Sequence, residues 1–142
     1  MIILYRPEDG EERHFDVKAV RTSEAQIVQR TTDMKWGDIK RGVRDDDPTA
    51  MRGVAWILLK RETPTLRWSD FDPLIDELTS RFDGREITAI AEDIVRMPEE
   101  QQEQAIAELK LYVFDPAAVD VAVKEAAEPP KEVTTKTSPT GA

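Results

Sequence analysis

Two residue types that carry much of protein chemistry are scarce in this sequence: cysteine is absent, and histidine occurs once, at position 14. The absence of cysteine excludes disulfide bonds, Cys-ligated zinc, iron–sulfur clusters and thiol catalysis. A zinc site would need mostly carboxylate ligands, which suit zinc poorly. His14 stands in an expected strand beside no nucleophile motif. We interpret it as a half-exposed structural residue, and we expect no metal and no cofactor.

Positive charge is also in short supply, because 20 Lys and Arg stand against 29 Asp and Glu and leave a net charge of −9. An acidic surface repels phosphate, so we expect no broad nucleic-acid-binding patch. No apolar run approaches the roughly 18 residues of a membrane span. The first 20 residues reach Arg6, Glu8 and Asp9 too early for a signal peptide. We therefore expect a soluble intracellular protein that does not bind a membrane.

Catalytic signatures are missing as well. The sequence contains no G-x-x-x-x-G-K, G-x-G-x-x-G or G-x-S-x-G pattern. The acidic run Asp45–Asp47 lacks the alternate spacing and the turn glycine of a loop that binds cations through oxygen atoms. The carboxylates between residues 92 and 104 have no neighbours that would desolvate them, which favours a solvated face. We expect that the protein is not an enzyme.

What is present suits one small domain. The chain has 142 residues, of which 39% are apolar and 35% charged, enough for a modest core under a heavily solvated surface. The predicted fold is mostly α, with an N-terminal β-hairpin packed on a small helical bundle and a flexible C-terminal tail. We place the hairpin in residues 1–20, the helical domain in 21–114 and an acidic, largely disordered tail in 115–142.

Local patterns predict the individual elements. Residues 2–6 and 13–17 are short runs of β-formers on either side of the Asp9-Gly10 turn signal, which is typical of a hairpin. Ser23-Glu24-Ala25-Gln26 has the pattern of a capping box, which begins a helix. The expected helices span 24–32, 36–44, 48–61, 73–83, 85–96 and 99–113. Residues 117–127 have the composition of a transient helix, and 128–142 that of a disordered segment.

The helix expected over 48–61 is the most unusual part of the chain. Asp47 and Pro48 are typical of its first turn, and Pro64 prevents it from continuing. Apolar residues occupy nearly its whole circumference, including Met51, Trp56 and Leu59. Such a helix cannot face water on any broad side. It is either the central helix of the bundle or a helix partly covered by another protein.

Several of these stretches resemble a known family. Ser23-Glu24-Ala25, Met34-Lys35-Trp36, the helix from Ala50 to Trp56, and the corner from Arg61 through Pro64 to Asp70 follow one another in the order found in tail assembly chaperones of long-tailed, siphovirus-type phages of actinobacteria. The resemblance covers residues 22–72. Its pattern consists of structural residues, and the family has no active-site residues to carry over.

The resemblance implies a function in phage tail assembly and viral morphogenesis. Such chaperones bind the long, helical tape-measure protein, keep it soluble in the host cytoplasm and help tail-tube subunits polymerise around it. They are commonly made in two forms, the longer through a programmed frameshift, and this chain would be the shorter. The implied partners are the tape-measure protein, the tail-tube protein and the longer form. A homo-oligomer is compatible with this interpretation.

We expect five apolar residues to contribute to the core or to the surface that binds the client: Met51, Trp56, Leu59, Leu66 and Trp68. Two other functions remain open. One is another small virion or morphogenesis protein, such as a head–tail connector or a tail-completion protein. The other is a DNA-binding regulator that uses residues 24–44 as a helix-turn-helix, in which Lys35, Lys40, Arg41 and Arg44 are offset by neighbouring aspartates.

Overall fold

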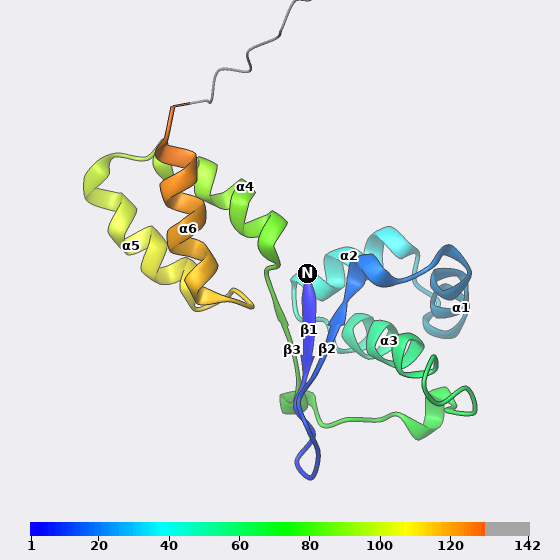
Figure 1. Ribbon diagram of the computed structural model, residues 1–142. Helices are drawn as coiled ribbons and strands as arrows, with labels where there is room; N and C mark the ends of the chain where they lie inside the picture. The colour runs from blue at the N-terminus through cyan, green and yellow to red at the C-terminus, as the bar shows by residue number, and fades with distance from the viewer. Residues whose placement is uncertain (130–142) are drawn as a thin grey trace, which may run out of the picture.

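The computed structural model describes residues 1–129, which form a mostly helical protein with a small antiparallel sheet (Figure 1). The elements are β1 (Ile2–Tyr5), β2 (Arg13–Asp16), α1 (Thr22–Thr32), α2 (Trp36–Arg44), α3 (Pro48–Leu59), β3 (Leu78–Arg81), α4 (Gly84–Val95), α5 (Glu99–Lys110) and α6 (Pro116–Ala127). Short 3-10 turns η1 (Val17–Ala19), η2 (Trp68–Asp70) and η3 (Ile75–Glu77) connect them. The mostly helical prediction is confirmed.

The N-terminal hairpin is confirmed, but it belongs to a three-stranded sheet in the order β2-β1-β3. The helix expected over 73–83 is wrong, because its second half is strand β3, whose Leu78 pairs with Tyr5 and whose Arg81 pairs with Ile2. Leu78 and Ser80 are buried while Thr79 and Arg81 are half-buried, which is the two-residue alternation of a strand. An isolated hairpin is marginal in water, and a third strand relieves that weakness.

Helix α3 is the centre of an N-terminal lobe, residues 1–81, in which α1, α2 and the sheet surround it. Every residue from Ala50 to Leu58 is buried except Arg52. Asp47 caps the helix by accepting a hydrogen bond from the Thr49 N–H at 3.2 Å, as expected from the sequence. The observed helix ends at Leu59, close to the predicted end. It is an apolar helix sheltered by its own fold.

Two glycines allow the neighbouring helices to approach α3 closely. A Cβ atom on Gly42 of α2 would lie 2.7 Å from the Cβ of Ala50, and one on Gly53 of α3 would lie 2.9 Å from Cγ1 of Val28 on α1. Both distances are shorter than van der Waals contact. The absence of a side chain at these positions therefore sets the spacing of the three helices.

The C-terminal helices α4, α5 and α6 form a second lobe, residues 84–127, with its own core (Figure 1). Ile87, Ala91 and Ile94 of α4 are buried together with Val119 and Ala122 of α6. The expectation of a largely disordered tail from 115 onward is thus wrong for residues 116–127. Asp115 caps α6, accepting from the Ala117 N–H at 3.1 Å, and Pro116 suits its first turn. Residues 130–142 of that expected tail lie outside the described residues.

The residues that directly follow β3 connect the two lobes. Phe82, directly after β3, donates its N–H to the Tyr112 carbonyl at 2.9 Å, and its own carbonyl accepts from the Phe114 N–H at 3.0 Å. The Phe114 ring stands edge-on to the His14 ring with centroids 4.8 Å apart. Gly84, which directly follows the helix expected over 73–83, is the first residue of α4. An isolated parallel bridge between Phe82 and Val113 thus links the end of β3 to the C-terminal lobe.

We expect Gly42→Ala to lower the free energy of unfolding by about 1–3 kcal/mol, because the added methyl group overpacks the contact with Ala50. This loss would outweigh the better helix propensity of alanine, which is about 1 kcal/mol. Urea unfolding measures the change. The matched control is Gly37→Ala in the same helix, where the new Cβ meets only Arg41 Nη1 at 3.9 Å. Equal effects of the two substitutions would contradict the close-approach argument.

Candidate functional site

The structure divides the five apolar residues expected to form a core or client surface into two groups. Met51 and Trp56 are buried, with 1% and 5% of their surface exposed. Leu59, Leu66 and Trp68 are half-buried and pack against the same core. The Trp56 and Trp68 rings meet edge to face with centroids 5.4 Å apart. Contact of these residues with a partner remains a prediction.

The corner between α3 and β3 is held by cations that bind backbone carbonyl groups. Arg52 donates to the Phe71 carbonyl at 2.6 Å and to the Trp68 carbonyl at 2.8 Å, and its guanidinium lies 3.8 Å from the Trp68 ring centroid. Lys60 Nζ donates to the Leu66 carbonyl at 2.9 Å. Charged donors strengthen such bonds, and the ring adds a cation–π attraction.

The tryptophan and arginine residues of the resemblance motif also serve this corner. Trp56 Nε1 donates to the Leu66 carbonyl at 3.1 Å. Arg61 pairs with Glu24 of α1 at 2.6 Å and donates to the Ala19 carbonyl at 2.7 Å. The hydrogen bond from Arg61 lowers the pKa of Glu24 and outweighs the opposing effect of burial. The Trp and Arg residues of the motif thus hold the corner and α1 against α3. These contacts give a structural reason for the positions of these residues in the sequence.

The large apolar side chains that face solvent lie elsewhere. Leu74 and Ile75 are 62% and 67% exposed, and Leu111 and Tyr112 are 68% and 59% exposed. Leu74 and Ile75 fall within the helix expected over 73–83, which does not form. The Asp-Pro pair before them belongs instead to an extended connection that ends in the short turn η3.

A groove of about 170 Å³ adjoins the exposed pair in the N-terminal lobe. It runs between the start of α3 and the connection that leads into β3. Its lining residues are Pro48, Thr49, Met51, Arg52, Asp72, Pro73, Ile75 and Leu78. Of the residues expected to bind a client, Met51 is the one that lines this groove, although its side chain is almost entirely covered.

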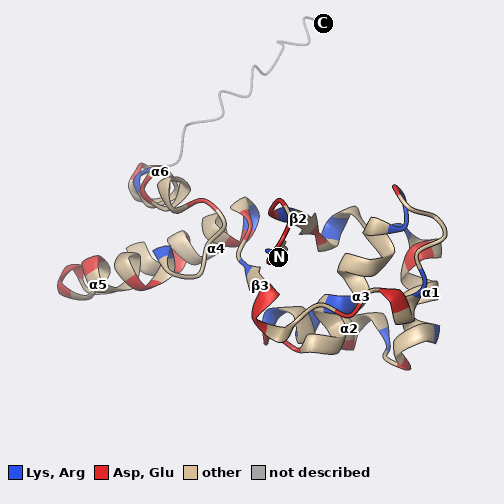
Figure 2. Ribbon diagram, turned by 90° about the horizontal axis from the view of Figure 1, so that it is seen from below, with Lys and Arg blue, Asp and Glu red and all other residues tan. Residues whose placement is uncertain are grey.

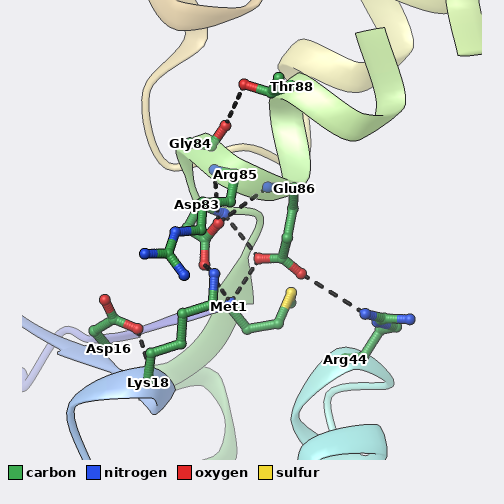
Figure 3. Close-up of polar contacts among 9 residues, drawn as sticks. All are labelled: Met1, Asp16, Lys18, Arg44, Asp83, Gly84, Arg85, Glu86 and Thr88. Carbon is green, nitrogen blue, oxygen red and sulfur yellow. Dashed lines mark hydrogen bonds and ion pairs between the residues drawn. The ribbon is translucent and has the colours of Figure 1, made fainter. Parts of the chain in front are cut away.

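A cluster of charges at the N-terminus of α4 joins the two lobes (Figure 3). Asp83 caps α4, accepting from the N–H groups of Arg85 at 3.0 Å and Glu86 at 3.1 Å. The Met1 ammonium contacts Asp83 Oδ2 at 2.8 Å and Glu86 Oε1 at 2.6 Å. Lys18 Nζ lies 3.1 Å from Asp83 Oδ2. The cluster is therefore a compensated, mostly buried set of ion pairs.

The aspartate run before α3 also has structural partners. Asp46, with a left-handed φ of 55°, accepts from the Ser80 N–H at 3.0 Å and from Ser80 Oγ at 2.6 Å. It thereby occupies the outer edge of β3, where an unpaired strand would otherwise attract another chain. In the part of the chain that the structure describes, no three His, Asp or Glu side chains gather in an arrangement that holds a metal ion.

We expect Trp56→Ala to lower the free energy of unfolding by about 3–5 kcal/mol, since it removes a large side chain from the core. Trp56→Phe keeps most of the packing and loses the bond to the Leu66 carbonyl, which costs about 1 kcal/mol. Circular dichroism during urea unfolding measures both. An alanine variant that unfolds at the wild-type midpoint would show that Trp56 serves a surface.

A second prediction concerns Asp83 and pH. Burial by itself raises the pKa of this carboxyl, but hydrogen bonds from the Met1 ammonium, the Glu86 N–H and Lys18 outweigh it and hold the pKa well below its ordinary value of 3.8. The stabilisation is therefore complete above pH 3.8 and is lost as the pH falls toward the folded-state pKa.

We expect Asp83→Asn, which remains a good helix cap, to lower the free energy of unfolding at pH 7 by about 1–3 kcal/mol. The difference from wild type should shrink below pH 3.8, because protonation of Asp83 removes its charge from the wild-type protein, while the other carboxyls titrate in both proteins and cancel. Urea unfolding at several pH values measures it. The control is Asp93→Asn, whose partner Arg96 is 3.5 Å away and whose side chain is 73% exposed. A pH-independent difference would refute the linkage.

Comparison with known proteins finds no matching family model, no similar curated protein and no similar solved structure. Among the described residues, no helix combines the length and the apolar character needed to cross a membrane. The function must therefore be argued from the chain itself: its sequence pattern, its buried apolar helix and its exposed apolar pairs.

Proposed function

We propose that this protein is a non-enzymatic tail assembly chaperone of a long-tailed phage, which binds the tape-measure protein in the host cytoplasm and keeps it soluble while the tail tube forms. The observation that carries this proposal is the exposure of large apolar side chains in adjacent pairs on an acidic protein. Leu74–Ile75 and Leu111–Tyr112 are each more than half exposed. Single exposed apolar residues are ordinary, whereas paired large ones favour a binding surface.

The charge of the chain supports the same function. A protein that holds an apolar client must present apolar surface and still stay soluble itself. A net charge of −9 supplies that solubility. Acidic residues occur on both lobes (Figure 2). Binding of the tail-tube protein, and of a longer frameshifted form of this chain, belongs to the same proposal.

The residues that carry the family resemblance support the proposal indirectly. Among them, Trp56, Arg61 and Trp68 make contacts that hold the corner after α3 in place. A family pattern made of core and corner residues describes a scaffold. The client surface is then free to lie on residues outside the pattern, such as the exposed pairs.

A second candidate function is DNA binding through α1 and α2, which three residues separate. Lys40, Arg41 and Arg44 are exposed on α2 and favour it. Acidic neighbours take up part of this charge, because Arg41 pairs with Asp38 and Arg44 lies 3.8 Å from Glu86. Phosphate binding by such a surface would be weak and would fall steeply with salt.

Co-expression with the tape-measure protein encoded by the same phage tests the proposal. We expect the soluble fraction of the tape-measure protein to rise several-fold when this chain is present, because exposed apolar surface on the client becomes covered. The matched control is the Trp56→Ala variant, whose fold is weakened. A client that stays insoluble would contradict the proposal, and presence of the chain in finished particles would favour a connector. A salt-dependent shift of DNA in a gel would favour the second candidate.

A further inference from the structure

We propose that the groove beside Ile75 binds an apolar segment that carries Lys or Arg, such as an amphipathic helix with one large side chain inserted and cations around it. This inference rests on the proposed function, because it names the chemistry of the client segment and the place where it binds. The observations behind it are a hollow of suitable size, an exposed apolar pair and a rim of carboxylates without cationic partners.

The hollow has the dimensions of a side-chain pocket. Its volume is about 170 Å³, and apolar cavities of about 150 Å³ in other proteins admit benzene. Buried Met51 and Leu78 line it together with Pro48 and Pro73, which are rigid and apolar. Ile75 lies at its edge, 67% exposed, and Leu74 precedes it at 62%. One aliphatic or aromatic side chain of a partner fits the pocket while its neighbours cover Leu74 and Ile75.

The charge around the groove selects the partner. Asp72 lines it, and Asp76 and Glu77 directly follow Ile75. Within residues 1–129, none of these three carboxylates forms a salt bridge with a Lys, Arg, His or ammonium group. Together with burial, the charge of Glu77 raises the pKa of nearby Tyr5. The rim is therefore negative.

Arg52, the one cation in the lining of this groove, offsets only part of the negative charge of the rim. Arg52 already donates to the Phe71 and Trp68 carbonyl groups and stacks on the Trp68 ring. It keeps its charge in these contacts, so it offsets one of the three carboxylates and leaves the surroundings of the groove net negative. A partner that brings Lys or Arg would complement the carboxylates, with each rim pair contributing about 0.2–1 kcal/mol. Apolar insertion then provides most of the affinity, and charge provides the preference and the rate of association.

The same charge argues against a second copy of this chain as the occupant. Two chains with a net charge of −9 repel each other, and the groove presents its own carboxylates to the approaching surface. The other exposed pair, Leu111 and Tyr112, is less suited to this partner. It follows Lys110, which pairs with Asp120 at 2.9 Å, and neither residue lines the groove beside Ile75.

The test uses two labelled peptides of about 18 residues, five helical turns, built from Leu and Ala with either Lys or Glu on the polar face. Fluorescence anisotropy measures their binding to the full chain. We expect the Lys peptide to bind and the Glu peptide to bind at least about tenfold more weakly. Leu74→Ser/Ile75→Ser should weaken the Lys peptide by about tenfold or more, since each apolar side chain contributes roughly 1.5–3 kcal/mol when buried.

Two further variants distinguish binding in the groove from nonspecific binding to exposed apolar surface. Val121→Ser, the control at an apolar residue that is 56% exposed and lies outside both exposed pairs, should leave binding of the Lys peptide unchanged. Asp72→Asn/Asp76→Asn should weaken it and flatten its dependence on salt, because rim charges are screened. Equal losses in the two serine variants, or equal binding of both peptides, would overturn the inference. Sedimentation that reveals a dimer abolished by Leu74→Ser/Ile75→Ser would assign the groove to a second copy instead.

Co-expression distinguishes failure of this inference from failure of the proposed function. If the Leu74→Ser/Ile75→Ser variant keeps the tape-measure protein as soluble as wild type does, the function stands and this groove is the wrong site. If wild type leaves that protein insoluble yet binds the Lys peptide through the groove, the proposed function fails and the specificity of the site stands.

Discussion

The fold of this protein depends on the burial of α3, a helix with apolar side chains nearly all the way round. Each large apolar side chain that it buries contributes roughly 1.5–3 kcal/mol, so the helix is stable only where neighbours cover every side. α1 and α2 reach it through Gly53 and Gly42, and the sheet covers a further side. The short hairpin, the third strand and the tight helix spacing all serve this one requirement.

After α3 the chain turns through the corner from 61 to 71, and charged side chains hold this corner by hydrogen bonds to its backbone. Arg52 and Lys60 donate hydrogen bonds to backbone carbonyl groups of the corner from 61 to 71. Because a buried carbonyl without a donor is costly, these cations stabilise the corner more than a surface ion pair would. The same arrangement turns residues 72–77 outward, which exposes Leu74 and Ile75 and leaves the acidic groove beside them.

The two lobes are joined by chemistry of a different kind. Backbone hydrogen bonds between Phe82 and residues 112–114 form an isolated bridge, and the compensated charges around Asp83 lie at the junction. The lobe with α4, α5 and α6 has its own core, so the exposed pairs on the two lobes belong to separately stabilised surfaces.

Local patterns determined the hairpin, the cap at Asp47 and the apolar helix, because these depend on neighbours within a few residues. The sequence also determined the acidic charge and the absence of thiol chemistry. Only the tertiary structure decided that Leu78–Arg81 forms a strand, since that choice depends on β1, some 75 residues away in the chain. It likewise decided that residues 116–127 form an ordered helix, because Val119 gains a core only when α4 lies beside it. Exposure of Leu74 and Ile75, and with it the candidate site, follows from those long-range contacts.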